Sequence, residues 1–309
     1  MPFHKVVFTD IDGTLVDINT AEYGRETNKL INIIKEKNIP LILTSAKTRL
    51  EQDKIREDLG LSDPFIVENG GAIVIPKGYF PDNALGDIGY PLRETENKTK
   101  DETKDVNQKT VILIELGKSA DYIRARLSNI REEYNISFRG VADTSIEELS
   151  NFASISKEQA KRMAQRNYGE TILQIQNEDI ARFIKYVQED GMKIIHGGRF
   201  FDVTVGTDKG IAVGILKKLF KDKFHNDVTF FGIGDSTNDI PMLSLMDIPI
   251  LVQRQDGSWI NYSEINEVKN ATDSGSSSSI SSSNNVIKVK GIGPIGWENA
   301  ILKIILELN

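Results

Sequence analysis

Over the first 80 residues, short runs of apolar residues alternate with stretches in which the apolar residues would fall on one side of a helix. Lys5–Thr9 is an apolar, β-branched run that stops at a carboxylate, which is typical of a buried parallel strand. Apolar positions on one side of residues 30–34 predict a helix, and Pro40–Thr44 predicts a second strand with a proline at its entry. The sequence Thr48–Glu51 fits a capping box that opens another helix. This order predicts the start of a parallel α/β sheet.

The middle of the chain follows a different pattern. Phe65–Val67 and Ala72–Ile75 flank Asn69-Gly70-Gly71, which predicts a hairpin. Arg93–Thr110 contains a single apolar residue and charges of both signs, so we interpret it as a solvated linker rather than a binding surface. Beyond it the pattern predicts a separate α+β unit, with strands at Val111–Leu116, Ile136–Phe138, Thr171–Ile175 and Met192–Ile195 and helices around 123–134, 145–152, 156–166 and 180–187.

From Arg199 onward, strands and helices alternate again. The pattern predicts strands at Arg199–Val205, Val228–Ile233 and Ile248–Val252, and helices at Lys209–Lys221, Asp239–Met246 and Trp297–Leu308. The serine-rich stretch Asp273–Asn285 is predicted to be a flexible surface loop without a catalytic role. The fold class is therefore α/β: a Rossmann-like parallel-sheet core made of residues 1–88 and 197–309, with residues 89–196 inserted as a second, α+β domain.

The amino-acid composition argues against several classes of protein. The 309 residues include 39% hydrophobic and 27% charged residues, as in an ordinary globular protein. No apolar run approaches the ~20 residues of a membrane helix, and Asp10 comes too early for a secretory signal. The chain has no cysteine, which excludes disulfides and thiolate metal sites and favours the cytoplasm. A net charge of −7 argues against a general nucleic-acid binder.

The first chemical signal is Asp10-Ile11-Asp12-Gly13-Thr14, at the carboxyl end of the first strand. Open α/β sheets bind ligands at these strand ends, so both carboxylates fall where a site is expected. A calcium-binding loop is excluded because Leu15 and Ala21 replace the required Gly and Glu. A plain strand-end turn stays open on this segment alone.

A second acidic pair lies in Gly234-Asp235-Ser236-Thr237-Asn238-Asp239, at another strand end. Thr237 stands where a dinucleotide-binding motif needs its third glycine, which weakens that interpretation. Two acidic clusters at parallel strand ends favour a hard cation such as Mg²⁺, which takes oxygen ligands. Taken alone, Asp235 could merely cap the next helix.

Two further residues complete the pattern. Ser45 ends the second strand and Lys209 opens a helix, and a hydroxyl and an ammonium are suitable donors for phosphoryl oxygens. Each residue by itself has an ordinary explanation, as a strand-end serine or a solvated lysine. Together with both acidic clusters they favour a phosphate site.

In this order the motifs resemble those of the haloacid dehalogenase superfamily of phosphatases, and the inserted unit resembles its large α+β cap. More narrowly, the chain is similar to the mannosyl-3-phosphoglycerate phosphatase family. The stretches that carry this similarity are Ser45–Arg49, Pro64–Gly71, Ile75–Lys77, Arg166–Thr171, His196–Phe201 and Gly293–Trp297.

The resemblance implies a role for each motif residue. Asp10 would be the nucleophile that forms an aspartyl-phosphate, and Asp12 the general acid and base. Ser45 and Lys209 would bind phosphate. Mg²⁺ would be held by Asp10, the backbone carbonyl of Asp12 and Asp235, with Asp239 and Asn238 orienting the ligands.

The resemblance also implies a small-molecule substrate bound between cap and core, with no nucleic-acid or membrane partner. Candidate substrate contacts are Lys47, Glu68, Asn69, Arg166 and Arg199. The expected reaction converts mannosyl-3-phosphoglycerate into phosphate and mannosylglycerate, a compatible solute. Glucosyl-3-phosphoglycerate or another sugar phosphate, a phosphomutase reaction, and a non-catalytic sugar-phosphate-binding protein stay open as alternatives. The sequence gives no expectation of oligomeric state.

Overall fold

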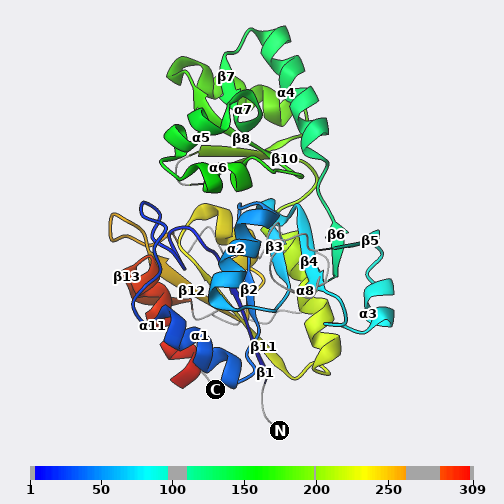
Figure 1. Ribbon diagram of the computed structural model, residues 1–309, viewed down its shortest axis with the longest axis vertical. Coiled ribbons are helices and arrows are strands. Elements are labelled where there is room, and N and C mark those ends of the chain that lie inside the picture. The colour runs from blue at the N-terminus through cyan, green and yellow to red at the C-terminus, as the bar shows by residue number, and fades with distance from the viewer. Residues whose placement is uncertain (1–3, 97–109, 198–199, 262–285, 307–309) are drawn as a thin grey trace.

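A computed structural model describes residues 4–96, 110–197, 200–261 and 286–306. Figure 1 shows a lower lobe that carries the first and last elements of the chain and an upper lobe that carries α4 to α7. No helix within the described residues is long and apolar enough to cross a membrane.

A parallel five-stranded sheet forms the centre of the lower lobe. Its strands, in spatial order, are β13 (Ile287–Ile292), β12 (Ile248–Gln253), β11 (Val228–Gly234), β1 (His4–Thr9) and β2 (Leu41–Leu43). Successive side chains of a strand point to opposite faces. Accordingly Val6 and Phe8 join one apolar cluster and Val7 joins the other. Both faces are covered, which confirms the predicted Rossmann-like core.

Helices cover both faces of this sheet (Figure 1). The apolar clusters place α1 (Thr27–Glu36), α2 (Arg49–Leu59) and α11 (Pro294–Leu306) on one face, and α8 (Lys209–Lys223) and α9 (Ile240–Leu243) on the other. The short helix α3 (Asp82–Gly86) packs against α8. The predicted capping box of Thr48 and Glu51 is present at the start of α2. Trp297 on α11 is fully buried, and its indole N–H donates to Thr9 Oγ1 over 3.1 Å, which fixes the end of β1.

A second, antiparallel sheet continues the lower lobe. It contains β3 (Phe65–Val67), β4 (Ala72–Pro76), β6 (Val111–Glu115) and β5 (Leu92–Thr95) in that order. The predicted hairpin is confirmed as β3 and β4, which are joined by the 3₁₀ turn η1 (Glu68–Gly70). A single parallel bridge between Thr44 and Ile66 connects this sheet to the end of β2.

The upper lobe has an antiparallel sheet between two pairs of helices. The strand order is β7 (Phe138–Gly140), β8 (Glu170–Ile175), β10 (Phe200–Thr204) and β9 (Lys193–Gly197). One face is covered by α4 (Ala120–Tyr134) and α7 (Ile180–Glu189), the other by α5 (Ile146–Ala153) and α6 (Lys157–Met163). In Figure 1, α5 and α6 lie on the side that faces the lower lobe, and α6 contacts α2.

Two strands were assigned to the wrong unit by the sequence pattern. Val111–Leu116 was expected in the inserted unit, but β6 pairs with β4 of the lower lobe. Arg199–Val205 was expected in the core, but β10 pairs with β8 and β9 of the upper lobe. An apolar run shows that a strand is buried but does not show its partners. These pairings favour an inserted unit that begins near residue 117 and ends near residue 205.

The structure also differs from the sequence prediction in where individual helices and strands begin and end. Part of the expected linker 93–110 is strand β5, whose polar side chains suit a sheet edge: Arg93 pairs with Glu115 over 2.8 Å. The strand expected at Ile136–Phe138 starts two residues later, and the helix expected at Asp239–Met246 is the short turn η4 (Thr237–Asp239) followed by α9. Helix α3 and strand β13 were not expected. The serine-rich stretch lies outside the described residues.

Candidate active site

Three neighbouring strands of the parallel sheet end in the predicted site residues. Asp10 follows β1, Asp235 follows β11, and Ser45 follows the Thr44 bridge that ends β2. The backbone N–H of Asp10 still donates to Ile233 O over 2.9 Å, so the strand pairing continues up to the carboxylate. All three side chains are buried. Parallel pairing therefore brings the two acidic motifs and the hydroxyl to one edge of the sheet.

An ammonium group lies between two carboxylates at this edge. Lys209, the first residue of α8, places its Nζ 2.7 Å from Asp10 Oδ1 and 2.7 Å from Asp239 Oδ1. Its side chain is 1% exposed. Asp235 completes an acidic cluster with Asp10 and Asp239 in which the possible ligand oxygens lie within 4.8 Å of one another. Three buried acids thus face a single buried base.

The electrostatics of this cluster reflect that imbalance. Burial raises the pKa of Asp10 well above its usual value, and the charge of Asp239 adds to this effect while Lys209 opposes it. Burial and Asp239 together raise the pKa of Asp235 to about 7. Burial lowers the pKa of Lys209, but attraction by Asp10 and Asp239 outweighs it, so the net shift is upward. The cluster is short of positive charge, and a cation would supply it.

The hydrogen bonds of Asp239 show that it orients its neighbours. Its Oδ1 contacts Lys209, and its Oδ2 accepts the backbone N–H groups of Asp235 and Ser236 over 3.2 and 3.1 Å. Both oxygens are therefore engaged within the protein. Asn238, which was expected beside it, accepts a hydrogen bond from the Ser236 hydroxyl. Asp239 thus contacts Lys209 and the main chain of Asp235, whereas the hydrogen bond of Asn238 is with Ser236.

Asp10 and Asp235 keep capacity for a cation. Asp10 uses Oδ1 for Lys209, and Asp235 uses Oδ1 to accept from the Thr14 hydroxyl over 2.8 Å. In the described part of the chain, these interactions leave the Oδ2 atoms of both acids for a further ligand. Buried carboxylate oxygens without thiolate or imidazole neighbours suit Mg²⁺. The residues present therefore fit the expected cofactor.

The glycine of the first motif is required by this geometry. Gly13 has a φ of +81°, which favours glycine. A Cβ at this position would lie 2.9 Å from Asp235 Oδ2. The Asp12–Thr14 loop can therefore approach the second acidic motif closely only because residue 13 has no side chain.

Asp12 has different surroundings from Asp10, although it is only two residues away. Its side chain is 37% exposed and forms an ion pair of 2.9 Å with Lys47 Nζ. Lys47 also lies 3.9 Å from Glu51. Burial lowers the pKa of Lys47, but Asp12 and Glu51 raise it more, so this lysine stays charged. Lys47 is thus a candidate contact for an anionic substrate group beside Asp12.

Ser45 lies in a tight loop after β2. Its hydroxyl accepts the backbone N–H of Lys47 over 3.2 Å, and its carbonyl accepts the backbone N–H of Asn69 over 3.0 Å. The hydroxyl proton can still be donated to a phosphoryl oxygen.

The other expected substrate contacts are occupied by contacts between the lobes. Both carboxylate oxygens of Glu68 accept backbone N–H groups, from Asn167 and Tyr168. The Asn69 amide donates to Asp202 over 3.1 Å. Asp202 was not among the expected site residues, since only the tertiary structure brings it to Asn69.

Arg166 is also engaged within the protein. Its Nη2 lies 3.6 Å from Asp202 Oδ1 and donates to Ala46 O over 3.3 Å. Its side chain is 5% exposed. Arg199, the remaining candidate, lies outside the described residues.

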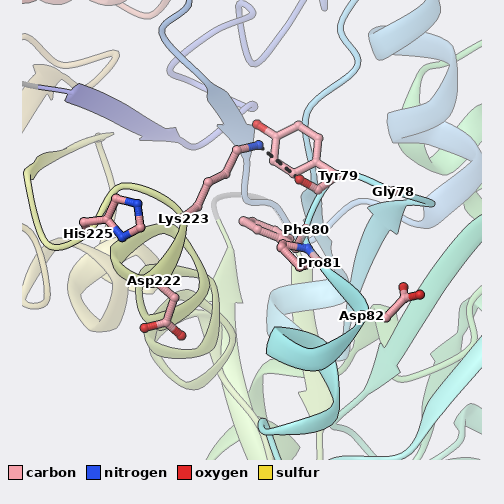
Figure 2. A pocket seen from close by; sticks show the side chains of 8 residues that line it. All are labelled: Gly78, Tyr79, Phe80, Pro81, Asp82, Asp222, Lys223 and His225. Atoms are coloured by element: carbon pink, nitrogen blue, oxygen red, sulfur yellow. Dashed lines mark hydrogen bonds between the residues drawn. The ribbon is translucent and has the colours of Figure 1, made fainter.

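A hollow of about 540 Å³ lies far from these residues. It is lined by Gly78–Asp82, Asp222, Lys223 and His225, and Figure 2 shows Lys223 directed at Tyr79. Lys223 ends α8, whereas Lys209 begins it. A helix of 15 residues spans roughly 20 Å, so this hollow is not part of the acidic site.

Comparison with known proteins identifies the class. Residues 7–275 match the family model described as haloacid dehalogenase-like hydrolase, and the chain therefore belongs to this family. The expected family and the fold it implies are confirmed. Among solved structures, a Thermoplasma acidophilum protein superposes with a TM-score of 0.60 at 16% identity, covering 99% of this chain and 100% of that one. A subclass IIB sugar phosphatase of the same superfamily gives a TM-score of 0.53 at 17% identity and covers 85% and 90%.

Sequence relatives extend over nearly the whole chain. A Methanococcoides burtonii protein named glucosyl-3-phosphoglycerate/mannosyl-3-phosphoglycerate phosphatase is 34% identical and covers 98% of both chains. A Persephonella marina protein with the same name is 31% identical over 98% of both chains. A Pyrococcus furiosus protein named mannosyl-3-phosphoglycerate phosphatase is 31% identical over 80% of this chain and 90% of its own.

The pKa of Asp235 predicts how a cation affects stability. In metal-free protein this raised pKa means that the folded chain binds more protons than the unfolded chain between about pH 4 and 7, so the contribution of Asp235 to stability falls as pH rises. A bound cation favours the ionised form and removes this loss. At saturating Mg²⁺ we expect the melting temperature to rise by about 5 °C at pH 8 and by much less at pH 5.

Differential scanning fluorimetry with and without Mg²⁺ measures this difference. Asp235→Asn should abolish most of the gain at pH 8. Asp58→Asn, at an exposed position on α2, should preserve it. An equal Mg²⁺ effect at both pH values would contradict the assignment of Asp235.

Proposed function

We propose that this protein is a Mg²⁺-dependent phosphatase that hydrolyses mannosyl-3-phosphoglycerate to mannosylglycerate and phosphate. The observation that carries the proposal is near-full-length similarity to enzymes named for this substrate, joined to a buried acidic cluster with the expected residues. The product would serve as a compatible solute, and we place the enzyme in the cytoplasm.

Asp10 is proposed as the nucleophile. Its carboxylate attacks phosphorus, the bond to the leaving oxygen breaks, and an aspartyl-phosphate forms. Lys209, held between Asp10 and Asp239, directs its charge at the transferring group. Ser45 donates its hydroxyl proton to a phosphoryl oxygen. Since these groups are buried and Lys209 is hydrogen-bonded to both acids, they would need little reorganisation during the reaction.

Asp12 is proposed to move the proton. It protonates the leaving oxygen of the phosphoglycerate, and it then removes a proton from the water that hydrolyses the aspartyl-phosphate. Its position at the exposed edge of the site suits a group that must reach both the leaving oxygen and water. Lys47 holds the Asp12 carboxylate in place and presents a positive charge to the glycerate carboxylate.

Asp10, Asp235 and the carbonyl of Asp12 are proposed to hold Mg²⁺, while Asp239 and Asn238 orient them. The bound cation would neutralise phosphoryl charge and lower the barrier to nucleophilic attack. The lower lobe would be the catalytic core and the upper lobe a cap that excludes water and selects the sugar.

Glucosyl-3-phosphoglycerate is the second candidate substrate, because two relatives are named for both compounds. The two sugars differ only in the orientation of one hydroxyl. A phosphomutase would use the same aspartyl-phosphate but pass phosphate to another sugar. A non-catalytic sugar-phosphate-binding protein is disfavoured because Asp10 and Asp12 are both retained.

Removal of the nucleophile gives the direct test. Asp10→Asn should lower kcat for mannosyl-3-phosphoglycerate by at least about 10³-fold, since an amide cannot form the acyl-phosphate. Phosphate release is measured with added Mg²⁺, and Asp58→Asn serves as the carboxylate control away from the site. Undiminished hydrolysis by Asp10→Asn would overturn the mechanism.

A substrate panel tests the assigned reaction. Mannosyl- and glucosyl-3-phosphoglycerate are compared by kcat/KM, with and without EDTA and with a second sugar as possible acceptor. We expect release to water, loss of activity in EDTA with recovery on adding Mg²⁺, and the highest kcat/KM for the mannosyl compound. Higher kcat/KM for the glucosyl compound would reverse the assigned substrate, and transfer to the added sugar would show a mutase.

A further inference from the structure

The turn between β3 and β4 has an unusual backbone. Glu68, Asn69 and Gly70 have φ values of +48°, +55° and +93° in succession. Non-glycine residues rarely adopt this left-handed conformation, and it persists where the surrounding structure imposes it. Glu68 and Asn69 are 1% exposed. Contacts with the surrounding protein therefore hold the turn in this left-handed conformation.

One side of the turn holds the segment that carries Ser45. The backbone N–H of Asn69 donates to Ser45 O, and that of Glu68 donates to Lys47 O, both over 3.0 Å. These two bonds fix the main chain on either side of Ala46. A displacement of the turn would therefore move the Ser45 hydroxyl and the Lys47 ammonium together.

The other side of the turn holds the segment that carries Lys209. Thr207 Oγ1 donates to Gly70 O over 2.6 Å. A Cβ on Gly70 would lie 2.1 Å from Asp208 O and 3.1 Å from Lys209 N, so the two backbones are in direct contact. The turn thus touches the main chain of both residues that are proposed to bind phosphate.

The side chains of the same turn reach the upper lobe. Glu68 accepts the N–H groups of Asn167 and Tyr168, each over 2.9 Å, and the Asn69 amide donates to Asp202. Asp202, on β10, is buried and also accepts from the Thr171 hydroxyl. A carboxylate of the cap therefore anchors a turn of the core.

This cluster is not built for stability alone. Asn69 Oδ1, Arg166 Nε and Thr204 Oγ1 are buried without a hydrogen-bond partner in the described protein. Buried polar atoms are normally satisfied, and exceptions concentrate where a geometry serves function. The left-handed backbone at Glu68 and Asn69 also indicates a functional role for this cluster.

We propose that the Glu68–Gly71 turn is a positioning element that transmits the position of the cap to Ser45 and Lys209, and that Asn69 and Asp202 connect it to the cap. This inference rests on the proposed function, which gives Ser45 and Lys209 their phosphate-binding role. It assigns Asn69 to positioning, in place of the substrate contact expected from the resemblance.

Two variants test the connection. Asn69→Gly removes the amide bond to Asp202 but tolerates the left-handed backbone. Asp202→Asn removes the charge and preserves the shape. Kinetics are measured with mannosyl-3-phosphoglycerate and with p-nitrophenyl phosphate, which has no sugar to contact the cap. Both variants should lose about tenfold or more in kcat on both substrates, because a small misplacement of catalytic groups is costly, with little change in KM.

The matched control is Glu170→Gln. Glu170 is a buried carboxylate of the same cap sheet that pairs with Arg124 over 2.6 Å, within the cap. It should lower the melting temperature about as much as Asp202→Asn but preserve kcat. Hydrogen exchange of peptides covering residues 45–48 should be faster in Asn69→Gly and Asp202→Asn than in wild type or Glu170→Gln.

Two results would overturn the inference. A raised KM for the sugar phosphate alone would show that Asn69 contacts substrate. Equal kinetics and exchange for Asp202→Asn and Glu170→Gln would show that Asp202 only stabilises the cap. If wild type hydrolyses neither substrate, the proposed function fails, while the exchange of residues 45–48 still decides whether the turn is coupled to the cap.

Discussion

The site depends on one buried ammonium group that must balance several acids. Lys209 can neutralise one of the three buried carboxylates of Asp10, Asp235 and Asp239. If all three are ionised, two negative charges are left, and this crowding of charge contributes to the raised pKa values of Asp10 and Asp235. Buried charge is expensive unless it is paired. A divalent cation supplies the missing charge, and a monovalent cation would supply half of it. The arrangement therefore favours a hard divalent ion before any substrate is considered.

Two different elements hold the residues of this cluster. The pairing of β1 with β11 brings Asp10 and Asp235 together. The start of α8 supplies Lys209, and Asp208 caps this helix by accepting from Ile211 N over 3.0 Å. Asp208 also pairs with Lys193 of the upper lobe over 2.8 Å. The upper lobe thus contacts the core both at Asp208 and at the neighbouring turn after β3.

The sequence correctly predicted those features that depend on a few neighbouring residues. The capping box of α2, the acids at the ends of β1 and β11, and Lys209 at the start of α8 all follow from short stretches of sequence. The pairing partners of β6 and β10 could not be predicted, because an apolar run does not show to which sheet a strand belongs. The polar edge strand β5 was read as a linker for a related reason: an edge strand needs few apolar residues.

The resemblance to known phosphatases located residues near the site but not their partners. It grouped Lys47, Glu68 and Asn69 as substrate contacts, yet their surroundings differ. Lys47 is partly exposed beside Asp12, whereas both oxygens of Glu68 are used by backbone N–H groups. Glu68 therefore has no carboxylate oxygen left to offer a ligand. Burial and hydrogen-bond partners, which only the tertiary structure gives, therefore separate binding from positioning.

The same reasoning separates the two aspartates of the first motif. Asp10 is buried against Lys209, which suits the nucleophilic role proposed for it. Asp12 is over a third exposed and is held by the flexible side chain of Lys47. A carboxyl that first donates a proton and then accepts one must exchange partners between the two steps. The glycine that follows it lets the loop that carries this exposed acid approach Asp235 of the buried cluster closely. Two neighbouring carboxylates can thus perform different chemistry because their environments differ.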